Sequence, residues 1–230
     1  MTDLREVVLD TETTGLDYKQ GDKIIEIGGI ELINKVKTGK FFHSYINPKK
    51  RVNDVALNIH GISNEFLADK PLFTDIAKDF AVFIKDSRLV IHNAKFDMGF
   101  INNEFSLAGM PKISISGVID TLLLAREKYP GSPASLDALC KRFNISLDKR
   151  DKHGALLDSE LLAMVYVELI GGKQRKFSFQ NRHLQISNKT KNCSKFPNRN
   201  FSLSKSEEDS HQELLKSLTE PIWKKYGVDN

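Results

Sequence analysis

A short acidic motif directly follows a buried strand near the start of the chain. The apolar run Val7–Leu9 predicts the strand, and the residues from position 9 onward are L-D-T-E-T-T-G. Side chains two residues apart on a strand point to the same side, so Asp10 and Glu12 project together. Two carboxylates held this close repel each other unless a cation lies between them or one of them is protonated. Thr13–Gly15 then end the strand pattern with small residues, which leave room for a ligand near the backbone. Taken alone, the motif also fits a polar turn on the surface.

Two further acids lie on helix faces that are otherwise apolar. Asp97 precedes Phe100 by three residues, although an acid in a first helical turn is also favoured by the helix dipole. Asp158 precedes Leu161 by three residues and Val165 by seven, which places a carboxylate on the buried face of a helix. Burial of an unpaired carboxylate costs several kcal/mol, so a partner is required. One metal centre could serve these two acids together with the first pair.

His153 precedes Asp158 by five residues, which on a helix would place the two side chains about 140° apart around the axis. We therefore expect it on the loop before that helix, where Gly154 gives the backbone freedom, although a lone histidine there could equally be a surface residue. Hard oxygen ligands without cysteine favour Mg²⁺ or Mn²⁺ over zinc. Two such ions about 4 Å apart can hold the attacking and leaving oxygens of a phosphodiester, while a histidine deprotonates the water. The residues therefore predict metal-assisted phosphodiester hydrolysis.

The composition is that of a soluble globular protein. The 230 residues are enough for one well-cored domain and an appendage, with 40% hydrophobic and 28% charged residues. No apolar stretch approaches the roughly 20 residues that a membrane span needs, so we expect a cytoplasmic protein without a membrane partner. The two cysteines, Cys140 and Cys193, are too few and too far apart for a disulfide framework or a zinc site.

Hydrophobic periodicity predicts a mixed α/β sheet of five strands, with helices on both faces and a flexible C-terminal tail. Asn93 is expected to cap the helix that carries Asp97, and Asp120 to cap the helix that follows it. Besides the first strand, the predicted strands are 23–32, 40–46, 88–92 and 113–119, and the predicted helices include 73–84, 136–143 and 155–169.

The tail differs from the body in charge. Residues 173–230 contain 12 Lys and Arg against 6 Asp and Glu, whereas residues 1–172 contain 22 against 24. A basic tail suits nucleic acid or an acidic partner, but it may also be no more than a solvated linker. We expect a flexible basic linker at 173–206 and an amphipathic docking segment at 207–230, in which Leu214, Leu218 and Ile222 share a face beside Trp223.

Three motifs together resemble the DEDDh branch of the DnaQ-like exonuclease superfamily. They are D-T-E-T-T-G at 10–15, H-N-A-K-F-D at 92–97 and H-G-A-L-L-D at 153–158, supported by S-L-D-A-L-C at 135–140. The resemblance covers about residues 5–172 and implies a ribonuclease H-like domain over 1–172 with 3′–5′ exonuclease activity. It also implies a site of two divalent cations, Mg²⁺ or Mn²⁺, in which His153 is the general base. The implied metal ligands are Asp10, Glu12, Asp97 and Asp158.

The resemblance also implies how the substrate binds. I-H-G-I at 59–62 resembles a family segment whose histidine contacts the terminal nucleotide, which assigns His60 to substrate binding. A family glutamate five residues earlier is replaced here by Val55, so a contact there would be apolar or through the main chain. The backbone near Thr13 is expected to face the terminal sugar or base, and Asp10, Glu12 and Asp158 to contact the substrate as well.

Within the branch, the chain is similar to the proofreading epsilon subunits of bacterial DNA polymerase III. This similarity implies a component of the polymerase holoenzyme that binds a DNA 3′ terminus, docks on the polymerase (alpha) subunit through its C-terminal segment, and has a possible small theta-like partner. The hexamer at 174–179 resembles a sliding-clamp motif, with Gln174, Phe177 and Phe179 as its contacts. Two alternatives stay open: an RNA-processing exonuclease with the same catalytic residues, and a non-catalytic scaffold that bridges clamp and polymerase.

Overall fold

The computed structural model describes residues 4–148, 152–171 and 203–219. The chain divides into two units, within residues 1–178 and within residues 179–230. The first unit contains the sheet and the three acidic motifs, and the second contains one described helix. Most of the predicted linker at 173–206, including the predicted clamp contacts Gln174, Phe177 and Phe179, lies outside the described residues.

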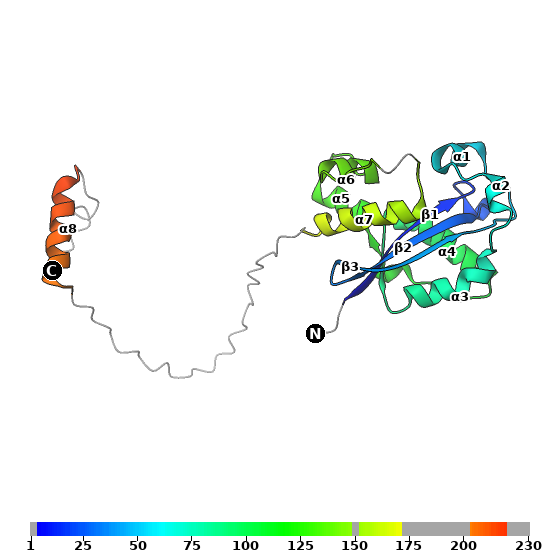
Figure 1. Ribbon diagram of the computed structural model, residues 1–230, viewed down its shortest axis with the longest axis horizontal. Helices are drawn as coiled ribbons and strands as arrows, with labels where there is room; N and C mark the ends of the chain where they lie inside the picture. The colour runs from blue at the N-terminus through cyan, green and yellow to red at the C-terminus, as the bar shows by residue number, and fades with distance from the viewer. Residues whose placement is uncertain (1–3, 149–151, 172–202, 220–230) are drawn as a thin grey trace, which may run out of the picture. The chain divides into compact units, whose positions relative to one another are not determined.

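The first unit is built on a five-stranded mixed sheet with the strand order β3-β2-β1-β4-β5 (Figure 1). β1 (Arg5–Thr13), β2 (Ile24–Ile33) and β3 (Val36–Tyr45) pair antiparallel in that order. β4 (Arg88–Ile91) runs parallel to β1 on its other side, and the short β5 (Ile119–Asp120) runs parallel to β4. β1 is therefore the central strand, where the antiparallel and parallel halves of the sheet meet.

The hairpin between β2 and β3 turns on two residues. Asn34 and Lys35 both have positive φ, 50° and 71°, as in the two-residue turns whose twist matches that of the flanking strands. This short connection joins two antiparallel neighbours in the sheet.

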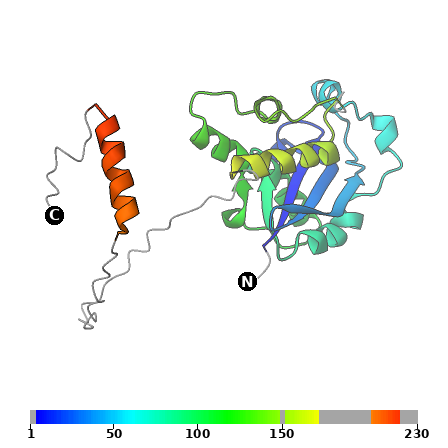
Figure 2. The ribbon, with the colours of Figure 1, turned by 60° about the vertical axis from the view of Figure 1, so that its left-hand side comes forward.

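Helices cover both faces of the sheet (Figure 2). α3 (Phe73–Ile84) and α4 (Ala94–Leu107) pack against one face, and α7 (Ala155–Leu169) against the other, with α5 (Thr121–Lys128) and α6 (Leu136–Arg142) beside it. Two short helices, α1 (Asp54–His60) and α2 (Asn64–Leu67), follow β3. Among the described residues, no helix combines the length and the apolar character needed to cross a membrane.

The alternation along β1 decides where its acids point. Val7 and Leu9 belong to the core beneath α3 and α4, whereas Val8 packs with residues of α7. Asp10 and Glu12 have the parity of Val8 and therefore continue on the α7 side of the sheet. The register shifts just after Glu12, so a bulge ends the regular pairing of β1 with β2 beside the acidic motif.

The start of α7 lies directly on the backbone of β2. A Cβ atom placed on Gly28 would be 2.3 Å from the carbonyl carbon of Ala155, so only a glycine allows this approach. The Ser159 hydroxyl donates a hydrogen bond to the Gly28 carbonyl oxygen at 2.9 Å. Because Gly28 pairs with Asp10 across the sheet, this contact brings the first turns of α7 over the acidic end of β1.

The strand predicted at 113–119 is mostly absent, and β5 contains its last residue and Asp120 alone. Ile115–Gly117 form a 3₁₀ turn in which the Ser114 side chain accepts a hydrogen bond from the Ser116 amide. The Asn102 side chain also bonds both the amide and the carbonyl of Ile113, at 2.7 and 3.0 Å. Polar side chains here satisfy backbone groups that a strand would have paired, so the alternating pattern was misleading.

The second unit contains α8 (Lys205–Ser217). The helix begins with a capping box, in which the Ser204 side chain accepts from the Glu207 amide and the Glu207 side chain accepts from the Ser204 amide. It begins at the end of the predicted linker and stops before Pro221. Leu214 is exposed on it, while Ile222 and Trp223 of the predicted docking segment lie outside the described residues.

Replacement of Gly28 by Ala is expected to destabilise the domain by about 1–3 kcal/mol, because the added methyl group overlaps the backbone of α7. Urea unfolding, followed by circular dichroism, measures the change. Gly117→Ala is the matched control, since a Cβ at Gly117 would have no atom within 4 Å. Equal stabilities of the two variants would contradict the close contact.

Candidate active site

Three potential metal ligands converge at the C-terminal end of β1. Ligand atoms of Glu12, His153 and Asp158 all lie within 4.8 Å of one another. They come from β1, from the loop that precedes α7, and from the first turn of α7. His153 Nδ1 is 3.2 Å from Asp158 Oδ2. His153 lies on the loop, as its spacing from Asp158 predicted.

The two remaining acids of the motifs, Asp10 and Asp97, do not belong to this group of mutually close ligand atoms, but their charges interact with it. Asp97 is buried in the first turn of α4, where its Oδ1 accepts a hydrogen bond from the Thr11 hydroxyl at 2.7 Å. This bond ties α4 to the strand that carries Asp10. Burial raises the pKa of Asp10 well above its usual value, and the charges of Asp97, Glu12 and Asp158 raise it further. Asp158 is only 3% exposed, so it faces the cluster and not the solvent.

The cluster is electrostatically unfavourable without a cation. Burial raises the pKa of Glu12 to about 8, an effect that His153 partly opposes and that Asp158 and Glu26 reinforce. Burial also raises the pKa of Asp97 to about 7, against the hydrogen bond from Thr11. Carboxyl groups that hold a proton near neutral pH exchange it readily for a metal ion. The donor set of carboxylates and one imidazole therefore fits a divalent cation.

The entry to α4 differs from the predicted cap. Asn93 adopts the left-handed conformation, with φ 64°, and its side chain makes no capping bond. The Asp120 carboxylate instead accepts hydrogen bonds from the amides of Asn93 and Ala94, at 3.2 and 3.0 Å. It also accepts from Leu122 at 2.9 Å and thereby caps α5, as predicted. One side chain thus caps two helices, one of which carries Asp97.

Of the further residues predicted to bind substrate, Val55 and His60 lie on α1 and Thr13 is the last residue of β1. The backbone amide of His153 donates to the Ile59 carbonyl at 3.4 Å, which joins the loop of His153 to the end of α1. His60 is buried, its Nδ1 accepts from the Ile62 amide at 3.0 Å, and within the described residues its Nε2 has no hydrogen-bond partner. Thr13 is buried and its hydroxyl donates to the Gly15 carbonyl at 2.6 Å, whereas Val55 is exposed.

Glu26 was not among the predicted site residues. This residue of β2 pairs directly with Glu12 and is buried, and its charge raises the pKa of both Asp10 and Glu12. A signal was present, because Glu26 stands among apolar residues of a strand that was correctly predicted. A buried acid in such a strand needs a partner just as Asp158 does.

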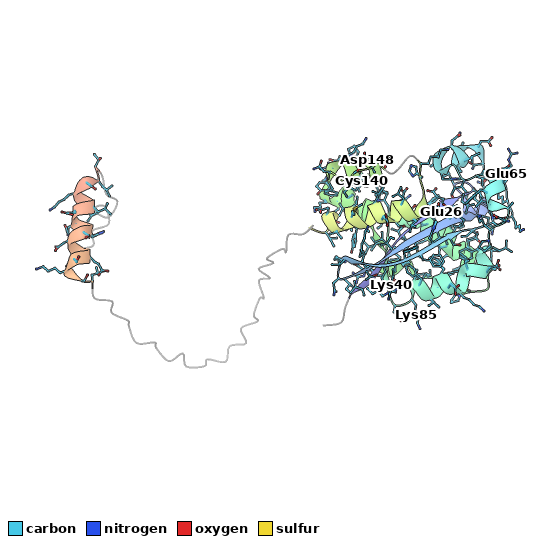
Figure 3. All side chains as sticks on the ribbon, in the orientation of Figure 1. Glu26, Lys40, Glu65, Lys85, Cys140 and Asp148 are labelled. Atoms are coloured by element: carbon cyan, nitrogen blue, oxygen red, sulfur yellow. The ribbon has the colours of Figure 1, made fainter. Side chains whose placement is uncertain are left out.

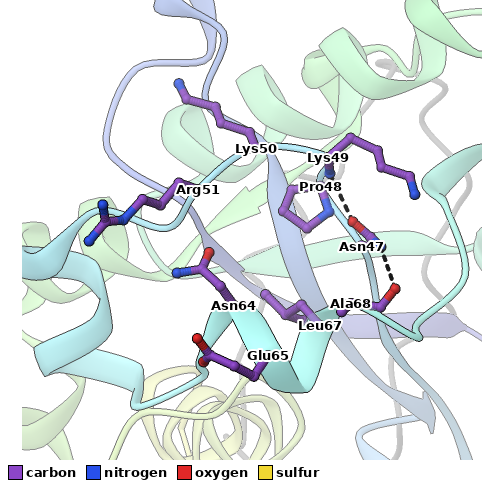
Figure 4. A pocket seen from close by; sticks show the side chains of 9 residues that line it. All are labelled: Asn47, Pro48, Lys49, Lys50, Arg51, Asn64, Glu65, Leu67 and Ala68. Atoms are coloured by element: carbon purple, nitrogen blue, oxygen red, sulfur yellow. Dashed lines mark hydrogen bonds between the residues drawn. The ribbon is translucent and has the colours of Figure 1, made fainter.

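A cavity of about 530 Å³ lies apart from the acidic cluster (Figure 4). Asn47 links two of its walls, since its side chain donates to the Ala68 carbonyl at 2.9 Å and accepts from the Lys49 amide at 2.9 Å. None of the predicted site residues lines this cavity. Its lining residues are Asn47, Pro48, Lys49, Lys50, Arg51, Asn64, Glu65, Leu67 and Ala68.

Comparison with known proteins defines the class of the chain. The RNase_T family model, described as Exonuclease, matches residues 7–166, so the chain belongs to this exonuclease family. The nuclease domain of 3′hExo, a DEDDh family member, has a similar fold with a TM-score of 0.63 at 19% identity, over 74% of this chain and 94% of that one. The predicted fold class is thereby confirmed.

Two relatives place the chain more closely. The DNA polymerase III subunit epsilon of Rickettsia felis is 49% identical over 229 residues, which cover 95% of this chain and 98% of the relative. Its counterpart from Rickettsia typhi is 55% identical over 196 residues, 84% of this chain and 86% of the relative. Within the exonuclease family, the chain belongs with the DNA polymerase III epsilon subunits. The predicted enzyme class, a 3′–5′ proofreading exonuclease, is confirmed, and this class uses divalent metal ions.

The stability of the metal-free protein should depend on pH through Glu12. Its pKa of about 8 in the folded protein lies above the ordinary glutamate value of 4.5, so between these values the folded protein holds a proton that the unfolded chain has lost. This contribution is present at low pH and is lost as pH rises towards 8. We expect the melting temperature of wild type to fall relative to that of Glu12→Gln as the pH rises from about 5 to about 8, because Gln does not titrate.

The comparison with Glu12→Gln is needed because burial lowers the pKa of His60 and His92, which gives an opposite slope near pH 6.5. Saturating Mg²⁺ should reduce the fall in wild type, since the cation replaces the proton. A pH-independent difference between the two proteins would contradict the raised pKa.

Proposed function

We propose that the chain hydrolyses the 3′-terminal phosphodiester of a newly made DNA strand by a two-metal mechanism and releases deoxynucleoside 5′-monophosphates. The ligands would be Asp10, Glu12, Asp97 and Asp158, with His153 as general base. One observation carries the proposal: four acids from one strand and two helices share a site in which the pKa values of Glu12 and Asp97 are raised to about 8 and about 7. A cation relieves this repulsion.

The donor set favours Mg²⁺ or Mn²⁺. Carboxylate oxygens without a thiolate suit hard divalent cations. Ions bound there would lower the pKa of a water molecule and stabilise the negative charge that builds up on the phosphate. Asp10, Glu12 and Asp158 would reach the substrate phosphate from the α7 side of the sheet, and Asp97 would complete the site from α4.

His153 is suited to remove the proton from the attacking water. Its side chain is 46% exposed, so water reaches it, and its Nδ1 lies 3.2 Å from Asp158 Oδ2. This contact orients the ring and leaves Nε2 as the basic nitrogen. The hydrogen bond from the His153 amide to Ile59 holds the loop while the side chain turns toward the site.

The terminal nucleotide would lie between the acids and α1. Because His60 Nδ1 accepts a hydrogen bond from Ile62, its Nε2 carries the hydrogen and can donate to the terminal nucleotide. Val55, exposed on the same helix, would contact the nucleotide through apolar surface, and the Thr13 backbone would face the sugar or base. A mispaired end frays at lower cost than a paired one, which favours its removal.

The assembly of the subunit is proposed on its similarity to epsilon subunits. The segment 207–230 would dock on the polymerase (alpha) subunit, and α8 supports this because it exposes Leu214. Gln174, Phe177 and Phe179 would bind the sliding clamp, and a small theta-like subunit would join the nuclease body. Such a subunit works on the bacterial chromosome, in the cytoplasm.

The double variant Asp10→Ala, Glu12→Ala should lose Mg²⁺-dependent hydrolysis by more than roughly a thousandfold, because it removes ligands worth several kcal/mol of charge stabilisation. Release of mononucleotides is measured from a mispaired DNA primer and from a short RNA of the same sequence. The variant should still co-purify with the polymerase subunit. Unchanged hydrolysis would remove the metal assignment, and a wild-type preference for the RNA would favour an RNA-processing role.

A truncation after Gly172 should keep nuclease activity within about twofold of wild type on a short single strand, because no described residue beyond position 171 belongs to the hydrophobic core of the first unit. The same truncation should abolish co-purification with the polymerase subunit. If the truncated protein still co-purified, the docking role of the C-terminal segment would be wrong.

A further inference from the structure

Glu26 is a further carboxylate at the acidic end of the sheet, and it is buried. It is 2% exposed and stands directly opposite Glu12 in the β1–β2 register, so the two side chains lie on the same face. Glu26 also stands opposite Tyr45 of β3, and one row along the sheet Asp10, Gly28 and His43 are aligned in the same way. On the α7 side, this end of the sheet therefore has two rows of three residues, one from each of β1, β2 and β3. Gly28, in the middle of one row, has no side chain, and α7 packs against its backbone.

The carboxylate of Glu26 contacts two different elements. Its Oε2 accepts a hydrogen bond from the Ala155 amide at 3.1 Å, and its Oε1 is 2.8 Å from His43 Nε2. Figure 3 labels Glu26 beside the start of α7. Both oxygens are thus engaged with protein groups, and Glu26 is not among the residues whose potential ligand atoms lie within 4.8 Å of one another.

α7 has no cap of its own. Its N-cap residue is Gly154, which has no side chain to accept a bond from the first amides, so Glu26 of β2 takes that role across the sheet. A negative charge at a helix N-terminus is also favoured by the helix dipole. Ala155 lies two residues after His153 and three before Asp158, so its position determines where both side chains start.

The position of Glu26 has an electrostatic disadvantage. Its charge adds to the repulsion among Asp10, Glu12 and their neighbours, and a neutral residue would avoid this. The cost of placing Glu26 beside the other acids must be offset by a contact that depends on the length of its side chain and on its acceptor oxygens. The Ala155 bond is such a contact, because it fixes the helix without occupying the space of the metal ions.

We infer that Glu26 is a positioning residue for hydrolysis: held by His43, it fixes the first turn of α7 so that His153 and Asp158 meet the acids of β1. The inference rests on the proposed roles of His153 and Asp158. The positioning effect of Glu26 depends on the length of its side chain and on its acceptor oxygens, and not on its charge.

Two substitutions separate reach from charge. Glu26→Asp keeps the charge but is one methylene too short for the Ala155 amide, and Glu26→Gln keeps the length and an acceptor oxygen. We expect Glu26→Asp to lower kcat by roughly 10- to 100-fold with KM within about twofold, and Glu26→Gln to retain kcat within about threefold. The full chain is assayed with Mg²⁺ on a mispaired DNA primer and on the p-nitrophenyl ester of thymidine 5′-monophosphate.

Glu31 provides a matched control on the same strand. It is also 2% exposed, and it bonds Arg5 Nε and the Thr38 hydroxyl at 2.7 Å each, opposite Val7 and away from the acidic cluster. Glu31→Asp should lower the melting temperature about as much as Glu26→Asp while kcat stays within about threefold of wild type. Equal losses of kcat in the two Asp variants would mean that Glu26 only stabilises the fold, and would overturn the inference.

A second readout needs neither metal nor a variant. First-turn helix amides usually exchange quickly with water because they lack intrahelical partners, whereas the Ala155 amide should be protected in the metal-free protein. Hydrogen exchange by NMR tests this, and Glu26→Asp should lose the protection at Ala155 while keeping it at Leu162. A fast-exchanging Ala155 in wild type, or a Glu26→Gln variant as impaired as Glu26→Asp, would overturn the inference. The proposed function is tested separately by the double variant Asp10→Ala, Glu12→Ala. If that variant loses hydrolysis, the proposed function stands even where the inference about Glu26 fails.

Discussion

Repulsion among carboxylates is the constraint on which this domain is arranged. Asp10 and Glu12 share one strand, and Asp97 and Asp158 approach them from helices on opposite faces of the sheet. Both helices present their first turns, whose dipoles favour nearby negative charge and so offset part of the repulsion. The remainder is visible in the raised pKa values of Asp10, Glu12 and Asp97. The fold thus holds these carboxylates close together, so that a bound cation would relieve the repulsion among them.

Side chains other than those of the four acids hold the helices against this repulsion. The Thr11 hydroxyl holds Asp97, the Asp120 carboxylate holds the start of α4, and Glu26 holds the start of α7. Each contact joins a strand end to a first helical turn, where backbone amides lack partners within the helix. The capping needs of two helices and the geometry of the site are therefore met by the same hydrogen bonds.

Much of this was accessible from the sequence, because periodicity reports which face a residue occupies. The alternation from Val7 to Glu12 gave the side of the sheet, and the apolar spacing around Asp158 identified it as buried. Contacts that depend on tertiary approach were not accessible. Gly28 resembles any strand glycine until α7 is placed on it, and the second helix capped by Asp120 is 26 residues away in the chain. The failed strand at 113–119 shows side chains such as Asn102 overriding a local pattern.

The contact of α7 with Gly28 makes the spacing of the proposed metal ligands insensitive to changes in the core. Elsewhere in the domain helices rest on side chains, whose replacement shifts a helix by fractions of an ångström as the core repacks. Here the helix rests on main chain, with one serine hydroxyl fixing its rotation. Substitutions can therefore accumulate in the surrounding hydrophobic layers over evolutionary time. They would alter thermal tolerance while the relative positions of the acids stay the same.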